Sequence, residues 1–281
     1  MRIATWNVNS LKARLPRVEE WLAQRAPDVL LMQETKLADE AAPEMPFRMA
    51  GYELAHHGEG RWNGVAIASR VGISDVVTNF GDGPARRSPG PETSTAATAE
   101  AVAARASEAP GDEARMISAV CGGVRVVSIY APNGRALDTP FYRAKLAWFD
   151  RLARWLRETC DPAESLAIGG DFNVAPEDVD VYDPRDFVGS THVSEAERSA
   201  VGALRDWGLV DAYRLHHPEP GKFSWWDYRA GNFHKGLGMR IDHLYVTRSV
   251  ADRCTAAEID RDARKGQLPS DHAPVYIDLA D

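Results

Sequence analysis

The chain has 281 residues with 44% hydrophobic and 26% charged side chains, typical of a soluble globular protein, and we expect a single domain over residues 1–281. It has no run of about 18 apolar residues and no basic-then-apolar amino terminus, which argues against a membrane span and a secretory signal and predicts a cytoplasmic protein. The 41 acidic and 33 basic residues give a formal net charge of −8, which does not exclude a polyanionic partner, because enzymes that handle phosphates through a metal ion need clustered carboxylates.

Short β-rich apolar runs alternate with helical stretches along the chain. Helices are predicted over residues 11–25, about 140–158 and about 195–207, because apolar residues recur there at helical spacing. Strands are predicted at residues 2–6, 29–32, 52–56, 64–69, 115–120, 124–130, 166–168, 241–246 and 274–279. Hairpin-length turns between several of these strands favour antiparallel sheets covered by helices over a parallel, doubly wound sheet.

The segment at about residues 81–112 differs from the rest of the chain. It is rich in Gly, Pro, Ala, Ser, Thr and Glu and has no aromatic residue, so it can bury little surface. We interpret it as a low-complexity surface insertion that is flexible or partly helical around residues 96–106. The alternative is that Arg86 and Arg87 contact a polyanion.

The three cysteines are far apart in the sequence and form no Cys-x-x-Cys pair. Neither a disulfide framework nor a structural zinc site is therefore expected. We interpret Cys121, Cys160 and Cys254 as buried thiols in a reducing compartment. The sequence also has no glycine-rich phosphate loop, so no nucleotide cofactor is expected.

Polar side chains stand at the ends of the predicted strands. If strands that end in such groups lie antiparallel to strands that begin with them, the groups meet at one rim of the sheets. Each residue taken alone is more often a turn former or a surface hydrogen-bonding group. The set comprises Asn7, Asn9, Glu34, Tyr130, Asn133, Asp171, Asn173, Asp242, Asp271 and His272.

This set of side chains suits metal-assisted hydrolysis of phosphate esters. Glu34 and nearby carboxylates offer the hard oxygen ligands that Mg²⁺ or Mn²⁺ prefers. Either Asp171 or His272 is suited to activate water. Hydrogen bonds from Asn7, Asn173 and Tyr130 would stabilise charge on the phosphoryl oxygens. We expect a carboxylate partner, Asp242, to raise the pKa of His272.

Eight motifs carry a resemblance to a known family: TWNVNSLKAR, LMQETK, NGVAI, YAPNGR, GGDFN, FSWWDYR, MRIDHLYV and PSDHAPV. Their order and spacing resemble the exonuclease III family of abasic-site endonucleases, within the endonuclease/exonuclease/phosphatase superfamily. The match covers essentially the whole chain outside residues 81–112. Single motifs are shared across the superfamily, whereas FSWWDYR together with RID is much more specific to its DNA-repair branch.

The resemblance implies a four-layered α/β sandwich of two mixed, largely antiparallel β-sheets flanked by helices. It also implies a monomeric, Mg²⁺-dependent DNA-repair nuclease, with Mn²⁺ able to substitute. Such an enzyme cuts duplex DNA on the 5′ side of abasic sites. It also trims 3′ ends as a 3′→5′ exonuclease and as a 3′-phosphatase or phosphodiesterase.

The resemblance extends to individual site residues. Glu34 matches the metal-ligand glutamate, and Asn7 matches the asparagine that supports the metal and the carboxylate of Asp171. That carboxylate is the group usually assigned to activating water. Asp271 falls where a second or alternative metal contact is placed. Asn9 stands where the eukaryotic branch has an aspartate near the metal, which leaves one or two metals open.

Phosphate contacts and the orientation of the histidine are implied in the same way. Tyr130 and Asn173 match the residues that contact the scissile phosphate. Asp242 matches the aspartate that orients the histidine, here His272.

The same resemblance implies how substrate is recognised. Trp225, Met239 and Ile241 correspond to residues that line a small apolar pocket for a flipped, baseless deoxyribose, and the alternative for Trp225 and its neighbour Trp226 is core packing. Contacts with duplex or phosphate are expected from Arg135, Lys36, Lys12 and Arg14, each of which is equally consistent with a solvated surface.

Two other functions compete with this reading. A phosphatase or lipid phosphodiesterase on the same scaffold would need a wider pocket or an apolar, membrane-facing loop. A DNA-binding or scaffolding protein without chemistry would lack some catalytic groups, yet every expected position is filled.

Overall fold

The structure, a computed structural model, describes residues 1–81 and 112–280. The predicted insertion at about 81–112, including its expected helix at 96–106 and the pair Arg86 and Arg87, lies outside the described residues apart from its two ends. The strands are β1 (Arg2–Asn7), β2 (Val29–Gln33), β3 (Glu53–His57), β4 (Val65–Ser69), β5 (Ser74–Thr78), β6 (Met116–Cys121), β7 (Val124–Tyr130), β8 (Leu166–Asp171), β9 (Leu209–Asp211), β10 (Asp242–Thr247), β11 (Cys254–Ile259) and β12 (Val275–Leu279). The helices are α1 (Leu11–Arg25), α2 (Glu44–Met49), α4 (Pro140–Thr159), α5 (Glu195–Trp207), α6 (Asn232–Lys235) and α7 (Arg248–Ala251).

These strands form two six-stranded sheets. The first sheet has the order β11-β12-β1-β2-β4-β3 and the second has the order β5-β6-β7-β8-β10-β9. Each sheet contains one parallel pair, β1 with β2 and β7 with β8, and the other neighbours are antiparallel. A helix connects the two strands of each parallel pair, as a crossover requires.

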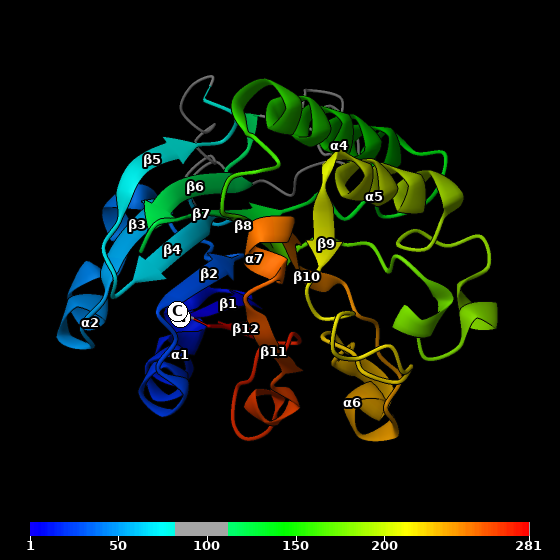
Figure 1. Ribbon diagram of the computed structural model, residues 1–281. Helices are drawn as coiled ribbons and strands as arrows, with labels where there is room; N and C mark the ends of the chain where they lie inside the picture. The colour runs from blue at the N-terminus through cyan, green and yellow to red at the C-terminus, as the bar shows by residue number, and fades with distance from the viewer. Residues whose placement is uncertain (82–111, 281) are drawn as a thin grey trace.

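The two sheets pack face to face and carry helices on their outer faces (Figure 1). One apolar cluster, which includes Leu31 and Val126, fills the space between the sheets. A second packs α4 and α5 onto the second sheet, and a third packs α1 onto the first sheet. The predicted four-layered sandwich of two mixed, largely antiparallel sheets is therefore confirmed.

A glycine lets the two sheets approach closely near the end of β8. A Cβ atom added at Gly169 would lie 2.7 Å from Leu31 Cδ1 and 3.2 Å from Thr5 Cβ, both on the first sheet. The same atom would lie 2.7 Å from Leu244 Cδ2. A larger residue here would push the sheets apart next to Asp171.

Local sequence explains where the two long outer helices begin. At α4, Thr139 accepts a hydrogen bond from the Tyr142 backbone N–H (3.2 Å), and Pro140 occupies the first turn, where its missing N–H costs nothing. At α5, Ser194 and Glu197 form a reciprocal capping box.

The main predicted elements are present, and three short strands were missed. The three long helices lie where periodicity placed them, and the strand predicted at residues 166–168 continues to Asp171. The strands β5, β9 and β11 were not predicted. They lie at the edges of the sheets, where β5 is largely exposed, β11 is mostly half-buried and β9 has only three residues, so their apolar pattern is weak.

The interpretation of all three cysteines as buried is wrong for two of them. Cys121 is buried, whereas Cys160 and Cys254 are half-buried, and none of the three is in a disulfide. Cys160 follows the last turn of α4 and Cys254 opens the edge strand β11, so both lie at the periphery of the core.

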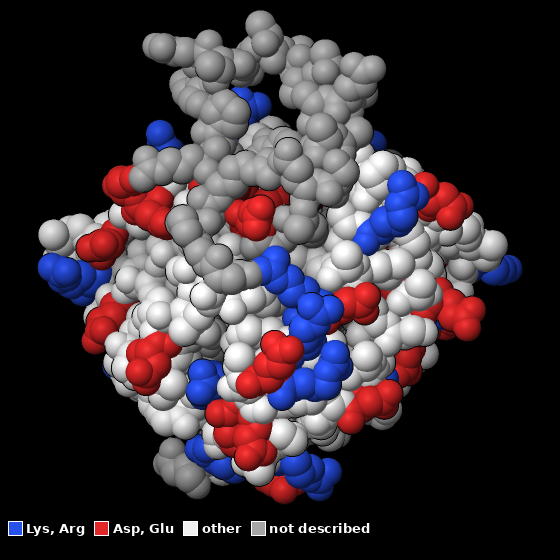
Figure 2. Space-filling view, turned by 90° about the horizontal axis from the view of Figure 1, so that it is seen from above, with Lys and Arg blue, Asp and Glu red and all other residues white. Residues whose placement is uncertain are grey.

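No helix within residues 1–81 and 112–280 is long and apolar enough to cross a bilayer. Seen from above, acidic and basic side chains are interleaved over the uncovered part of this face (Figure 2). Near the centre of that view several basic side chains lie next to one another, with acidic side chains on either side.

Candidate active site

Strand direction brings the predicted polar residues to one rim. Asn7 ends β1, and Glu34 directly follows β2, the parallel neighbour of β1. On the second sheet, Asp171 at the end of β8 is paired in register with Tyr130 of β7 and with Asp242, the first residue of the antiparallel strand β10. The predicted convergence of strand ends is confirmed.

Asn7 links carboxylates from the two sheets. Its Nδ2 donates to Glu34 Oε1 (2.9 Å) and to Asp171 Oδ2 (2.9 Å). Its Oδ1 accepts the backbone N–H of Asn9 (3.0 Å). Asn7 therefore presents its amino group to the carboxylates and orients them, and its oxygen is already engaged.

Three side chains present metal-ligand atoms to a common point. Glu34, Asp171 and His272 each offer an atom, and these atoms lie within 4.8 Å of one another. Two of the three donors are carboxylates, and such hard oxygen ligands fit Mg²⁺ or Mn²⁺. The residues present thus fit the cation that the family resemblance implies.

A buried imidazole–carboxylate pair stands beside this cluster. His272 Nδ1 lies 2.8 Å and 3.0 Å from the two oxygens of Asp242, and its Nε2 lies 3.8 Å from Asp171 Oδ2. Ser224 Oγ donates to Asp242 Oδ2 (2.6 Å) and accepts the N–H groups of Ile241 and Asp242. Ser224, which the sequence analysis did not single out, therefore holds the Asp242 carboxylate in place.

Burial and neighbouring charges shift the pKa values of this group. Burial disfavours the charged form of His272, but Asp242 and then Asp171 outweigh it and raise the pKa of His272 to about 10. Burial is the largest cause that raises the pKa of Asp171, to about 7; neighbouring carboxylates add to it and the imidazole opposes it. The predicted rise for His272 is confirmed, and the imidazole is a proton donor at neutral pH.

Tyr130 and Asn173 lie side by side at the same rim. Burial and the nearby Glu34 raise the pKa of Tyr130 well above its ordinary value, so the phenol is a donor, and the Arg115 guanidinium lies 4.8 Å from its ring centroid. Asn173 has a positive φ of 52°. Its Nδ2 donates to Ala131 O (2.9 Å), which leaves one of the two amide protons for another acceptor.

Asn9, Lys36 and Asp271 form a polar group next to Glu34. Lys36 Nζ lies 2.8 Å from Glu34 Oε2 and donates to Asn9 Oδ1 (2.6 Å). Both oxygens of Asp271 accept hydrogen bonds, from Asn9 Nδ2 (2.9 Å) and from Trp225 Nε1 (3.1 Å). Asp271 thus belongs to a polar group that adjoins Glu34 through Asn9 and Lys36.

The three predicted pocket residues lie together. Met239 and Ile241 belong to one small apolar cluster, against which the half-buried Trp225 packs. Backbone bridges join Trp225 to Met239 and to His272. Trp226, in contrast, is fully buried and packs edge-on against Phe233, so core packing is the correct reading for this tryptophan.

The remaining predicted contacts lie farther out. Arg135 is exposed, and its guanidinium stacks 3.8 Å from the Phe141 ring centroid. Lys12 is exposed on α1, and Arg14 donates to the Tyr228 hydroxyl (3.2 Å). Of these four basic residues, Lys36 alone forms an ion pair with a residue of the group Glu34, Asp171 and His272.

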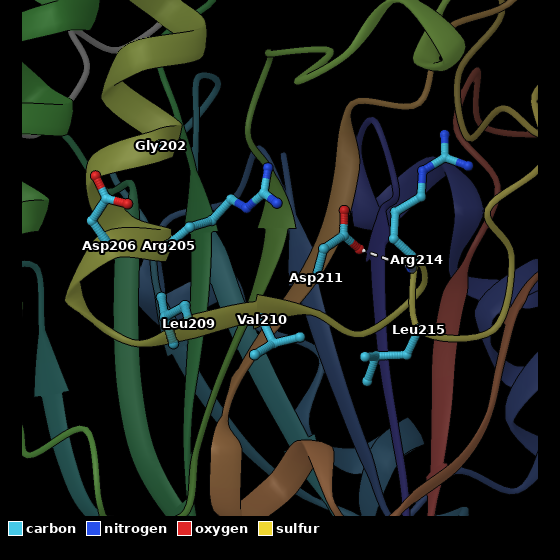
Figure 3. A pocket seen from close by; sticks show the side chains of 8 residues that line it. All are labelled: Gly202, Arg205, Asp206, Leu209, Val210, Asp211, Arg214 and Leu215. Carbon is cyan, nitrogen blue, oxygen red and sulfur yellow. Dashed lines mark hydrogen bonds between the residues drawn. The ribbon is translucent and has the colours of Figure 1, made fainter.

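A separate cavity of about 550 Å³ lies beside β9 and the end of α5 (Figure 3). Arg205 and Arg214 line it together with Asp211, which accepts the Arg214 backbone N–H (3.4 Å). It shares no residue with the predicted site. The chemistry of the molecule is therefore not centred on this cavity.

Comparisons with known proteins agree with this geometry. Residues 4–272 match the model of the Endonuclease/Exonuclease/phosphatase family. Exodeoxyribonuclease III of Haemophilus influenzae is 30% identical, over 99% of this chain and all of that protein. Two solved structures superpose on this one. They are an AP endonuclease from Archaeoglobus fulgidus (34% identity, TM-score 0.88, 99% of each chain) and the 3′ phosphatase NExo from Neisseria bound to a product DNA hairpin (36% identity, TM-score 0.87, 100% of this chain and 99% of that one).

The chain therefore belongs to the endonuclease/exonuclease/phosphatase family, whose members hydrolyse phosphate esters. Within it, the full-length similarity places the protein among the DNA-repair nucleases of the exodeoxyribonuclease III type, which are metal-dependent hydrolases.

Proposed function

We propose that this protein hydrolyses phosphodiesters on the 5′ side of abasic sites in duplex DNA and trims 3′ ends, including 3′-phosphates, with Mg²⁺. We further propose that it acts as a cytoplasmic monomer built as one domain over residues 1–281. The observation that carries the proposal is the Glu34, Asp171 and His272 cluster, held by Asn7 at the meeting point of the two sheets.

The protonation states of the protein's own groups give each of them a different role in hydrolysis. Asp171, with its pKa raised to about 7, accepts the proton of the attacking water. His272, kept protonated by Asp242, and the phenol of Tyr130 donate hydrogen bonds to the phosphoryl oxygens as charge builds. Asn173 supplies its remaining amide proton to the same phosphate.

Glu34 is the residue that would hold the cation, and Asp171 beside it is left to accept the proton of water. A bound Mg²⁺ or Mn²⁺ would offset charge on the non-bridging and leaving oxygens. Lys36 forms an ion pair with Glu34 Oε2 and so orients this carboxylate.

The apolar group of Trp225, Met239 and Ile241 supports recognition of a baseless sugar. Trp225 is bridged to His272 through its backbone, and the three side chains together offer apolar contact area. Extruding a sugar that has lost its base avoids most of the unstacking cost, so an abasic nucleotide enters more readily than an intact one.

The test is cleavage of end-labelled duplexes with Mg²⁺ or with EDTA. One duplex carries a single abasic analogue, a second is undamaged with recessed 3′ ends, and a third ends in a 3′-phosphate. We expect a metal-dependent cut 5′ to the lesion and release of 3′ phosphate. An Asp171→Ala variant should bind the lesion duplex but lose at least about 100-fold of the turnover.

The outcomes separate the proposed activities. Cleavage at the 3′ end alone would reject the abasic-site activity and retain the 3′ activity. No cleavage of any duplex, combined with hydrolysis of an inositol phosphate or a phospholipid, would replace the DNA function with the phosphatase or lipid phosphodiesterase alternative.

A further inference from the structure

The segment that follows β8 is held in place by side chains. The backbone carbonyls of three successive residues, 173, 174 and 175, accept hydrogen bonds from side chains. The donors, in that order, are Lys145 Nζ (2.6 Å) with His192 Nδ1 (2.5 Å), His243 Nε2 (2.9 Å) and Arg198 Nε (3.1 Å). The first of these carbonyls belongs to Asn173, so its position depends on Lys145.

Lys145 is a charged residue in a fully buried position. Its side chain and that of Glu197 are both 0% exposed, and Lys145 Nζ lies 2.5 Å from Glu197 Oε1. The ammonium group also donates to the carbonyls of Asn173 and Asn133 (3.3 Å). Each of its three protons therefore has an acceptor, and two of the acceptors are backbone groups of the active-site rim.

Glu197 is held in place by other residues in addition to Lys145. Its Oε1 accepts a hydrogen bond from Thr191 Oγ1 (2.6 Å). Its Oε2 accepts hydrogen bonds from the hydroxyl (2.7 Å) and the backbone N–H (3.1 Å) of Ser194, its partner in the α5 capping box. The backbone at Gly134 also packs closely against the lysine stem, because a Cβ atom added there would lie 2.9 Å from Lys145 Cδ. The lysine is thus held at both its stem and its ammonium group.

A buried ion pair of this kind is a poor source of stability, because desolvation of the two charges offsets most of their attraction. Asn173, in contrast, is joined to both segments that Lys145 holds. It has a φ of 52°, a left-handed conformation that asparagine adopts more readily than most residues, and its Oδ1 accepts a hydrogen bond from Asn133 Nδ2 (3.1 Å).

We propose that Lys145 is a positioning residue for phosphodiester hydrolysis: through the carbonyls of Asn173 and Asn133, and with Glu197 as its fixed counter-ion, it sets where the Asn173 amide meets the scissile phosphate. The proposal rests on the phosphate-contacting role given to Asn173 in the proposed function.

The test measures kcat and KM on the DNA substrate that the wild-type protein cleaves. Lys145→Met should lower kcat by about 10- to 100-fold, the scale of a misplacement of about 1 Å, and change KM by less than about threefold. Since this variant leaves Glu197 unpaired, the double variant Lys145→Met with Glu197→Gln removes both charges and should show the same kcat. Val201→Ala on α5 is the matched control; it opens a cavity in the core of the same helix pair and should lower Tm with kcat unchanged.

A cycle with Asn173→Ala separates positioning from structural support. If Lys145 acts through Asn173, then Lys145→Met in the Asn173→Ala background should have little further effect on kcat. A multiplicative effect, or an unchanged kcat in the folded double-charge variant, would overturn the inference while wild-type cleavage still supported the proposed function. A wild-type protein that cleaves no DNA would overturn both.

Discussion

Asp242→Asn should remove the proton-donor function of His272 while preserving the shape of the site. Ser224 Oγ accepts two backbone N–H groups, so its own proton must go to Asp242 Oδ2. An asparagine here must therefore keep its oxygen at the Oδ2 position, towards Ser224 and 2.8 Å from His272 Nδ1, and its NH₂ group takes the Oδ1 position, 3.0 Å from the same nitrogen. A donor then replaces one of the two carboxylate oxygens beside Nδ1, and the negative charge that stabilises the imidazolium is lost.

The expected loss is large because the imidazole loses its charge as well as one of its two acceptors. Without the carboxylate, the main cause that raises the pKa of His272 to about 10 disappears, and Nε2 no longer belongs to an imidazolium. An Asp→Asn change in the imidazole–carboxylate pair of serine proteases costs about 10⁴-fold in kcat, and loss of a general acid costs about 10²- to 10⁴-fold. We therefore expect kcat to fall by about 10²- to 10⁴-fold with KM nearly unchanged, in steady-state cleavage of the labelled duplex.

Asp260→Asn is the matched control. Asp260 is a buried carboxylate that accepts Trp21 Nε1 (3.0 Å) and Arg25 Nε (2.8 Å), and it lies outside the site. This variant should lose stability and keep kcat. A folded Asp242→Asn protein with kcat within about threefold of wild type would refute the reasoning, and so would an equal loss of kcat in Asp260→Asn.

Two further predictions concern the cation and pH. Glu34→Gln should weaken Mn²⁺ binding by roughly 10- to 100-fold in calorimetric titration, because an amide replaces a charged ligand; equal affinity would remove Glu34 from the ligand set. Burial, with Arg240 adding to it, lowers the pKa of His243 to about 4. Between this value and about 6.5, His243 therefore stays neutral in the native state and takes up a proton in the unfolded chain. Stability that is complete above pH 6.5 should therefore fall as the pH drops towards 4, by up to about 1.4 kcal/mol per pH unit from this group, and urea unfolding of His243→Gln should show a shallower dependence than wild type.

The polar residues at the rim of the sheets were predictable because they interrupt the apolar pattern of the strands. Asn7, Glu34 and Asp171 each follow an apolar run, and a polar residue at that point needs a reason beyond packing. Strand order was not readable from those runs, but any order that alternates strand direction brings their ends together. The edge strands were missed because β5 and β11 are half solvated and lack a continuous apolar run.

The supporting side chains could not be predicted in the same way. Lys145 and Glu197 are 52 residues apart, and each reads as an ordinary surface charge in an amphipathic helix. One signal was present: Lys145 occupies the same helical stripe as the buried Trp148, Phe149 and Leu152, where an apolar residue is expected. Ser224 left no such signal, because its three hydrogen bonds exist only after residues 241 and 242 reach it.

The span between the two sheets sets the distance between Glu34 and Asp171. Glu34 belongs to one sheet and Asp171 to the other, and a single amide group of Asn7 is hydrogen-bonded to both. Two residues before Asp171, Gly169 leaves no room for a side chain against Leu31. A change of core volume between the sheets that alters this span also alters the distance between the two carboxylates. Substitutions between the sheets, as at Leu31, are therefore expected to change the rate of phosphodiester hydrolysis, whereas a substitution under the outer helices, such as Val201→Ala, is expected to change stability alone.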